Sequence, residues 1–337
     1  MFPDFANPAD WLPWAFASLM GFSILVYVVL DGFDLGVGIL FPLASAEDQD
    51  KMIGSIGPFW DANETWLVLA VGLLLVAFPT AHGMILTALY LPVFVMLVGL
   101  ILRGVAFEFR AKARDHHKKL WNRLFFVGSL MTALAQGFML GLYIMGLDQT
   151  PATLAFAALT AVFLAVGYSF IGSAWLIHKT EGPLQRKSVR WARESLWGVI
   201  LGIGAVSLAT PLVSTRLFDK WLSVPEIFYL APLPILSGLL IVWLWRMVRE
   251  MPYPGDGRSW LPFAVATVLF ALAYLGMAYS FYPYVVPERL TIYEAAAAPE
   301  SLMIILVGAC VVVPVIAGYS LLAYTIFRGK ATLLRYD

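Results

Sequence analysis

The sequence has little charge for its length and a single cysteine. Only 13% of its 337 residues are Asp, Glu, Lys or Arg, whereas a soluble domain carries about 25%. So little charge cannot cover a globular protein of this size in water, which excludes an ordinary soluble enzyme. The lone cysteine, Cys310, permits no internal disulfide and no cysteine metal cluster. Basic and acidic residues number 22 each, so the charge balance also argues against a nucleic-acid partner.

Long apolar runs take the place of the missing charge. Hydrophobic residues make up 61% of the chain and its mean hydropathy is +0.80. Because a helix needs about 20 apolar residues to cross a bilayer, these runs predict an all-α polytopic membrane protein. The predicted spans number nine and cover 11–41, 58–79, 82–105, 122–146, 152–177, 195–214, 226–248, 260–284 and 301–327. No basic residue precedes Lys51, so the first run is interpreted as a span rather than a cleaved signal peptide.

The basic residues test this count and set the orientation. Of the 22 Lys and Arg residues, 19 fall after spans 1, 3, 5 and 7 or in the C-terminal tail, and 3 fall on the other side. The positive-inside rule therefore places the N-terminus outside and the C-terminus in the cytoplasm, which requires an odd number of spans. We expect one integral membrane domain, with four-helix bundles in 1–147 and 148–284 and a ninth, peripheral helix with the cytoplasmic tail in 285–337.

Histidine is also scarce where a membrane cofactor would need it. The chain has four histidines, and we place His82 at the outer end of the third span and His116, His117 and His178 in cytoplasmic loops. None then lies inside a predicted span, so no pair can ligate a haem at membrane depth. We expect the chain to bind no metal and no cofactor of its own.

Acidic residues interrupt three of the apolar runs. Asp31 and Asp34 lie three residues apart in the first span, which places them on one face of a helix. Gly32 and Gly36 beside them form a GxxxG pattern, which lets a neighbouring helix come close. Ionisable groups are costly inside a bilayer and indicate function by default. Buried carboxylates at such positions are typical of a proton-conducting chain.

Further acids lie at the start of the second span and at the end of the third. By the predicted orientation, all of these groups face the cytoplasmic side and belong to one cluster. The acids of the predicted proton path are Asp31, Asp34, Asp61, Glu64 and Glu108, with Trp60, Asn63 and Arg103 as supporting residues.

For each acid, an interpretation in which it has only a structural role also remains open. Asp61 and Glu64 can be first-turn acids at the interface, which the helix dipole favours. Glu108 can be an interfacial residue paired with Arg103 or Arg110. Asp31 and Asp34 can be a hydrogen-bonded packing seam between helices.

Three motifs carry a resemblance to a known family. They are "LDGFDLGVGIL" in the first span, "GPFWDANETWL" at the start of the second and "LRGVAFEFR" at the end of the third. In this order and spacing they closely resemble subunit II of the cytochrome bd-type quinol oxidases. The short loops resemble the cyanide-insensitive branch of that family.

The resemblance implies a haem-free subunit of a bacterial inner-membrane oxidase. In that family subunit I carries haems b and d, quinol is oxidised near the outer face, and oxygen is reduced to water with cytoplasmic protons. Asp31, Asp34 and Asp61 match acidic positions of the family, and its proton entry involves the aspartate that is Asp61 here. Some relatives have Asp in place of Glu108. Some hold a structural quinone in subunit II, and a small single-span accessory subunit and lipid are further implied partners.

Two other functional classes compete with this one. A proton-coupled secondary transporter would use the acidic pair of the first span and the glycine-interrupted spans. It would also need a substrate site near the middle of the membrane, whereas the candidate acids cluster toward one side. The third reading is a structural scaffold that stabilises a haem-bearing partner.

Overall fold

The chain folds as a bundle of long, membrane-length helices. A computed structural model of the protein describes residues 4–331 with the exception of 114, 214 and 254. Within those residues, nine helices are long and apolar enough to cross a membrane. Their bounds are Pro8–Leu40 (α1), Trp60–Ala77 (α3), Tyr90–Lys112 (α5), Asp115–Ile144 (α6), Pro151–Lys179 (α7), Gly182–Val213 (α8), Pro232–Glu250 (α11), Leu261–Phe281 (α12) and Pro299–Ile326 (α14). The predicted all-α polytopic fold is confirmed.

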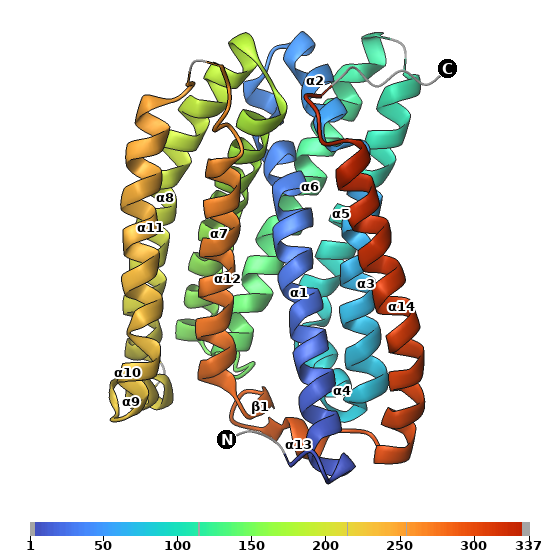
Figure 1. The fold of residues 1–337 in the computed structure, drawn as a ribbon, viewed down its shortest axis with the longest axis vertical. Helices are drawn as coiled ribbons and strands as arrows, with labels where there is room; N and C mark the ends of the chain where they lie inside the picture. Colours follow the sequence, from blue (N-terminus) through green and yellow to red (C-terminus); the bar gives the residue numbers. More distant parts are fainter. Residues whose placement is uncertain (1–3, 114, 214, 254, 332–337) are drawn as a thin grey trace.

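Short elements cover the two ends of the bundle. They are Phe41–Leu43 (η1), Ala46–Ile56 (α2), Pro79–Ala88 (α4), Thr215–Leu222 (α9), Glu226–Leu230 (α10), Tyr284–Val286 (β1), Leu290–Thr291 (β2) and Ile292–Ala295 (α13). The strands β1 and β2 form an antiparallel pair in which Tyr284 is opposite Thr291 and Val286 is opposite Leu290. Figure 1 shows the chain ends at opposite ends of the bundle, with α2 near the C-terminus and β1 and α13 near the N-terminus.

Local sequence signals explain where several helices begin. Asn7 caps α1 by accepting a hydrogen bond from the amide of Ala9 at 3.1 Å, and proline occupies the first helical position. Thr150 and Thr153 form a reciprocal capping box at the start of α7, again followed by a proline. Ser45 caps α2 by accepting a hydrogen bond from the amide of Asp48 at 3.4 Å.

The structure corrects the boundaries of some predicted spans. The third span does not begin at residue 82, because Pro79–Ala88 forms the separate helix α4 and the membrane helix α5 starts at Tyr90 and continues to Lys112. Pro79 starts this short helix and Leu89 leaves the helical conformation between the two. The eighth span ends at Phe281 rather than 284, because Tyr284 belongs to β1. That hairpin is a small exception to the all-helical prediction.

Helix α1 lies at the centre of the packing. It contacts α3, α6 and α7 extensively and reaches α12 and α14 as well. Its approach to α7 is close because a Cβ atom on Gly36 would stand 1.8 Å from the backbone oxygen of Tyr168 and 3.0 Å from the Cα atom of Gly172. The close contact predicted from Gly32 and Gly36 is therefore present, and its partner is α7.

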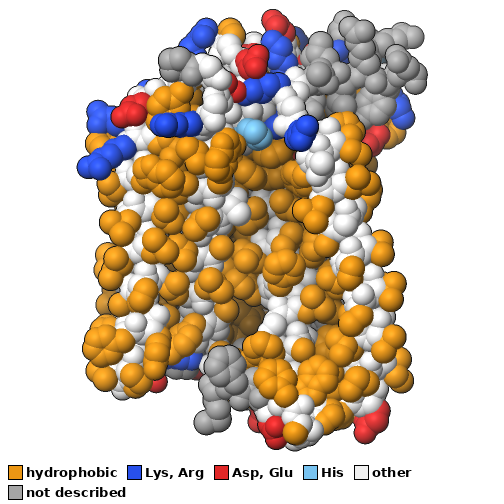
Figure 2. All heavy atoms as spheres, viewed as in Figure 1, with side chains coloured by type: hydrophobic (Ala, Val, Ile, Leu, Met, Phe, Trp, Pro, Cys, Tyr) orange, Lys and Arg blue, Asp and Glu red, His pale blue; other side chains and the backbone are white. Residues whose placement is uncertain are grey.

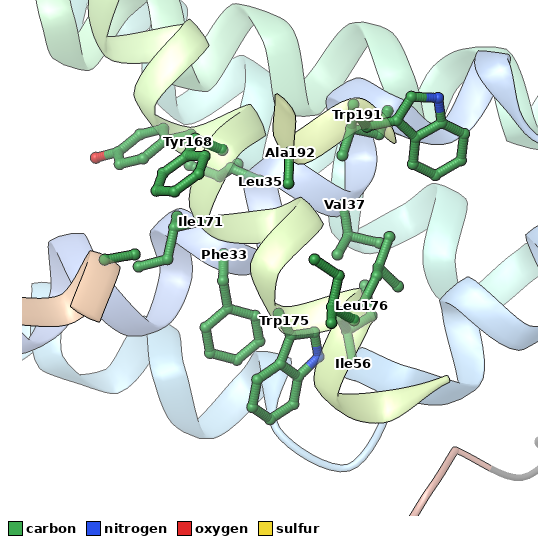
Figure 3. Close-up of a cluster of buried hydrophobic side chains, with 14 of the residues drawn as sticks. Phe33, Leu35, Val37, Ile56, Tyr168, Ile171, Trp175, Leu176, Trp191 and Ala192 are labelled. Atoms are coloured by element: carbon green, nitrogen blue, oxygen red, sulfur yellow. The ribbon is translucent and has the colours of Figure 1, made fainter. Parts of the chain in front are cut away.

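Aromatic and aliphatic side chains fill the space between α1 and α7. Phe33 of α1 stacks on Trp175 of α7 with ring centroids 4.2 Å apart, and Ile56, Leu176 and Val37 lie in the same cluster (Figure 3). The outside of the bundle is apolar as well. On the face drawn in Figure 2, hydrophobic side chains form a broad belt, and Lys and Arg side chains gather above it near the C-terminal end.

Candidate functional site

A buried arginine joins two acidic side chains from two other helices. Arg103 of α5 has 2% of its side chain exposed, and its Nη2 atom lies 2.6 Å from Oδ1 of Asp31 on α1, which is fully buried. The same nitrogen forms an ion pair with Oε1 of Glu64 on α3, whose side chain is 26% exposed. One positive charge therefore faces two carboxylates, and only Glu64 reaches toward the surface.

A second acid lies beside this ion-pair cluster. Asn63 of α3 donates a 2.8 Å hydrogen bond from Nδ2 to Oδ2 of Asp34, which is fully buried. The amide oxygen of Asn63 accepts a 3.0 Å hydrogen bond from the hydroxyl of Tyr324 on α14. Asn63 is thus held from both sides, and its orientation fixes the NH2 group against Asp34.

Several buried polar atoms of the site have no hydrogen-bond partner among the described protein atoms. Both carboxylate oxygens of Asp31 belong to this group, although Oδ1 lies in ion-pair contact with Arg103. The remaining atoms are Oδ1 of Asp34, Nε and Nη1 of Arg103, and the hydroxyls of Ser129 and Thr132. Since buried polar groups are normally satisfied by protein or by ordered water, the site has hydrogen-bonding capacity left for water.

Asp61 and Glu108 lie outside the ion-pair cluster. Asp61 is exposed in the first turn of α3, and Glu108 is half-buried on α5. The predicted pairing of Glu108 with Arg103 or Arg110 is wrong among the described residues, because Arg103 binds Asp31 and Glu64, and Arg110 binds Asp50 at 2.7 Å. Sequence spacing could not anticipate this because Asp50 lies on the separate helix α2.

The supporting tryptophan packs at the edge of the site. The ring centroid of Trp60 lies 5.2 Å from that of Phe107. A Cβ atom on Gly104 would lie in ordinary contact, 3.6 Å, with the indole ring of Trp60. Trp60 therefore fixes the start of α3 against α5, which positions the acids that follow it in sequence.

Sequence reasoning missed a buried polar chain next to Asp31. Tyr168 donates a 2.6 Å hydrogen bond to Gln136, and Gln136 donates a 2.6 Å hydrogen bond to the oxygen of Tyr27. Tyr27 precedes Asp31 by one helical turn on α1, so the two share a face. The four-residue spacing of Tyr27 and Asp31, together with Gln136 inside an apolar run, is the sequence signal that indicates this polar chain. Tyr324 carried no comparable signal, because it lies 261 residues from Asn63 in sequence.

The site lies nearer one end of the bundle than the other. Asp31 precedes the end of α1 by nine residues, and Arg103 precedes the end of α5 by the same number. At a rise of 1.5 Å per residue, both lie about 14 Å from those helix ends. Glu64 lies about 6 Å along α3 from its first residue. The acids therefore form a series that begins at the helix ends near the C-terminus and leads inward.

Comparison with known proteins assigns the family. The family described as cytochrome bd terminal oxidase subunit II matches residues 12–327. The chain belongs to this family. It is 27% identical over 324 residues to the cytochrome bd ubiquinol oxidase subunit 2 of Bacillus subtilis, covering 91% of this chain and 93% of that one. It is 26% identical to the cytochrome bd-I ubiquinol oxidase subunit 2 of Escherichia coli, with 93% of each chain covered.

A solved structure agrees with the fold of this chain. A chain of the bd oxidase from Geobacillus thermodenitrificans superimposes with a TM-score of 0.75 and covers 95% of this chain and 99% of that one. Its sequence is 15% identical, so the likeness concerns the fold alone. The predicted family is confirmed, and the relatives named above are subunits of a ubiquinol oxidase, an oxidoreductase complex.

The described histidines of this chain do not lie near the middle of a membrane helix. His82 lies on α4, His117 in the first turn of α6 and His178 in the last turn of α7. The last two are therefore in terminal helical turns rather than in loops as predicted. Over the described residues, no group of three or more His, Cys, Asp or Glu side chains converges on a metal position.

Proposed function

We propose that this chain is the haem-free subunit II of a bacterial cytochrome bd-type quinol oxidase, that it stabilises a haem-bearing subunit I, and that it supplies a path for cytoplasmic protons. Family membership supports the first statement at the level of the complex. The proton path is supported chiefly by one observation: acids from α1 and α3 converge on buried Arg103, and one of them, Glu64, reaches the surface.

The order of the acids along the helices indicates the direction of the path. Protons enter at exposed Asp61, one turn from Glu64 on the same helix. Glu64 and Asp31 share Arg103, and Asp34 lies one turn from Asp31. The half-buried Glu108 provides a second entry from α5. The unsatisfied oxygens of Asp31 and Asp34 favour water molecules that link these carboxylates.

Arg103 makes such a path compatible with folding. Two carboxylates in a dry interior repel each other and are costly, whereas a shared guanidinium attracts both and offsets one of the two negative charges. Because Arg103 has two guanidinium nitrogens without a hydrogen bond, it can also donate to water as a proton passes. The arginine remains charged, so the acids and water carry the protons.

The charge distribution supports an orientation. The positive-inside rule places the basic end of the bundle, which contains the C-terminus, in the cytoplasm and the N-terminus in the periplasm. With this orientation in the inner membrane, the exposed acid Asp61 faces the cytoplasmic side. Protons drawn from that side for the reduction of oxygen contribute to the proton-motive force.

Partners and cofactors follow from the family. Haems b and d, which oxidise quinol and reduce oxygen, are held by subunit I, and this chain meets that subunit within the membrane. A structural quinone and a small single-span subunit are further partners. The grouping of the helices into two bundles at 1–147 and 148–284, with residues 285–337 as the ninth helix and tail, remains part of this proposal.

The competing functions receive less support. A proton-coupled transporter conflicts with the oxidase family and with the placement of the acids toward one end of the helices. A purely structural role agrees with the family but leaves buried Asp31 and Asp34 without a purpose. The experiment therefore has to separate proton delivery from assembly.

The test compares Asp34→Asn and Asp61→Asn with the control Glu47→Gln in the purified oxidase. Glu47 is an acid on α2 with 81% of its side chain exposed and an ion pair to Lys51. For the two aspartate variants we expect oxygen consumption to fall about tenfold or more, with haem content and subunit stoichiometry near normal. Proton uptake from the inside of proteoliposomes should fall in parallel, and the control should match the wild type.

Other outcomes decide against parts of the proposal. Loss of haem in step with activity would show that the aspartates act in assembly. Normal proton uptake in both aspartate variants would contradict the path. Reduced-minus-oxidised spectra with haem bands in the separated chain would contradict the haem-free assignment, and purification without any haem-bearing partner would favour the transporter.

A further inference from the structure

A charged groove lies between α8 and α11, away from the acid cluster. Its volume is about 460 Å³, and its walls are formed by Arg193, Leu196 and Trp197 of α8 and by Trp245, Val248 and Arg249 of α11. The groove combines two arginines with two tryptophans. Both arginines and Trp197 are exposed.

The groove lies at the basic end of the apolar belt. Helix α8 begins and α11 ends on the side of the molecule where Lys and Arg side chains gather (Figures 1 and 2). Tryptophan and arginine at this level are typical of the zone where lipid headgroups meet the acyl chains. The place therefore fits a ligand with an anionic head and an apolar body.

Hydrogen bonds hold the first arginine in position. Arg193 donates from Nε to the backbone oxygen of Val248 at 2.9 Å and from Nη2 to the oxygen of Arg249 at 3.0 Å. These carbonyls belong to the last turn of α11, so Arg193 caps that helix and joins it to α8. No hydrogen bond within the described protein is assigned to Nη1, which leaves that nitrogen as a donor.

Stacking holds the second arginine. The guanidinium carbon of Arg249 lies 4.4 Å from the ring centroid of Trp245. A stacked guanidinium keeps its N–H edges available for an anion while its flat face covers the ring. Arg193 and Arg249 therefore present fixed donors from opposite walls of one groove.

Further basic side chains extend the positive surface along α8. Arg186, Arg190 and Arg193 are exposed and follow one another at spacings of four and three residues, so they share a helix face. Arg186 and Arg190 line a second groove of about 330 Å³ nearer the start of α8. The acidic neighbours Glu194 and Glu250 do not line either groove.

An apolar surface continues toward the middle of the membrane. Beyond the groove, exposed aliphatic side chains follow on both helices, with Leu201 of α8 at 65% exposure and Leu239 of α11 at 64%. An acyl chain lying along this surface would cover the exposed apolar side chains of both helices. From the groove toward the middle of the membrane, basic side chains are therefore followed by apolar side chains. A phospholipid has the same order, with a charged headgroup followed by acyl chains.

We propose that the groove between α8 and α11 binds the phosphodiester headgroup of an anionic phospholipid. Arg193 and Arg249 contact the phosphate oxygens, and Trp197 and Trp245 pack against the glycerol and the upper acyl chains. Basic pockets between membrane helices are suited to such headgroups. The site does not depend on the proton path, because none of its residues belongs to the acid cluster.

The test measures retained lipid on the purified, detergent-solubilised complex that contains this chain. The complex is delipidated, titrated with phosphatidylglycerol and examined by native mass spectrometry. We expect the variant Arg249→Gln to weaken binding of one phosphatidylglycerol about fivefold and Arg193→Gln/Arg249→Gln about thirtyfold, since each arginine contributes roughly fivefold near a membrane surface. The matched control is Arg123→Gln, which removes an exposed arginine near the start of α6.

Two further measurements distinguish a site for an anionic phospholipid from a site for any lipid or for free phosphate. Phosphatidylcholine should bind at least tenfold more weakly to the wild type, and inorganic phosphate should not compete at millimolar concentration. Equal weakening in Arg123→Gln, or unchanged binding in Arg249→Gln, would overturn the proposal. If the double variant fails to assemble because Arg193 caps α11, Arg249→Gln alone decides, since its side chain stacks on a ring at the surface.

Discussion

The two halves of the chain differ in their buried carboxylates. In residues 148–284, several of the described buried hydroxyls bind oxygens of their own helix, as Ser173 does with Phe170 at 2.7 Å and Thr210 with Val206 at 2.7 Å. No Asp or Glu among the described residues of this half is buried. The first half instead buries Asp31 and Asp34 with Arg103, and it connects them between helices.

This difference shows that helix packing here does not require buried carboxylates. The second half packs helices of similar length and hydropathy by local hydroxyl bonds, close contacts and aromatic side chains, and its buried Lys179 donates to the backbone oxygens of Phe327 and Gly329. A buried ion pair is weak evidence for stability, because hydrophobic replacements of similar volume are often neutral or stabilising. The charges of the first half are therefore better explained by function than by folding, which agrees with the proposed proton path.

Replacement of Arg103 should have the largest effect. Arg103→Gln leaves Asp31 buried without its cation and should cost about 3–5 kcal/mol of stability. The melting temperature and the yield of the intact complex measure this loss. The matched control from the other half, Ser173→Ala, removes one local hydroxyl bond and should cost about 1 kcal/mol or less. Equal costs for the two variants would remove the contrast between the halves.

The contact that joins the halves should give an intermediate effect. In Gly36→Ala the new Cβ atom would meet backbone rather than a flexible side chain of α7, so α1 and α7 must separate. Overpacking of this kind costs typically about 1–3 kcal/mol, which thermal unfolding of the complex can detect. Gly238→Ala on α11 meets nothing within 4 Å and should be close to neutral. A neutral Gly36→Ala would mean that the halves do not depend on this contact.

A partly exposed ion pair between the halves should give the smallest effect and a pH dependence. Burial alone would raise the pKa of Asp48, but hydrogen bonds from Lys187 and Ser45 outweigh it and lower the pKa below its ordinary value of 3.8. The pair, 2.6 Å apart, joins α2 to α8. Because the folded-state pKa is depressed, its contribution is present at neutral pH and is lost as the pH falls below about 4.

Unfolding at two pH values tests that contribution. Asp48→Asn should lower stability by at most about 1 kcal/mol at pH 7, since Lys187 is partly in solvent. The difference between variant and wild type should shrink as the pH falls through the depressed pKa. A difference that grows on acidification would have the wrong sign for a depressed pKa. Glu47→Gln, in the exposed pair with Lys51, provides the comparison and should change stability less.

The number of membrane spans and the main residues of the candidate site could be predicted from the sequence. Apolar length predicted nine membrane helices, and the i, i+3 spacing placed Asp31 and Asp34 together in the first span. The start of the third span could not be predicted, because the apolar segment 79–88 forms a short helix at the end of the bundle. Such a segment has the same composition as one that lies in the membrane. Proline at position 79 was the only local sign of the separate helix α4.

Partner choice inside the site could not be read from the sequence. Arg103, Arg110 and Glu108 lie within one short stretch of α5, and spacing alone favoured pairing among them. Arg103 and Arg110 are seven residues apart, so they share a face of α5 but lie about 10 Å apart along its axis, where Arg103 meets α1 and α3 and Arg110 meets α2. Glu108 lies five and two residues from them, so its side chain points to another face. Contacts such as Tyr324 with Asn63 depend on how distant helices meet, which the local pattern does not contain.

The hydrogen bond between Tyr324 and Asn63 has a consequence for biosynthesis. Asn63 leaves the ribosome 261 residues before Tyr324 does. The amide beside Asp34 therefore waits until α14 has been translated and inserted before it acquires its phenol partner. A nascent product without α14 would hold that carboxylate without this partner, so insertion of α14 sets when this part of the protein matures.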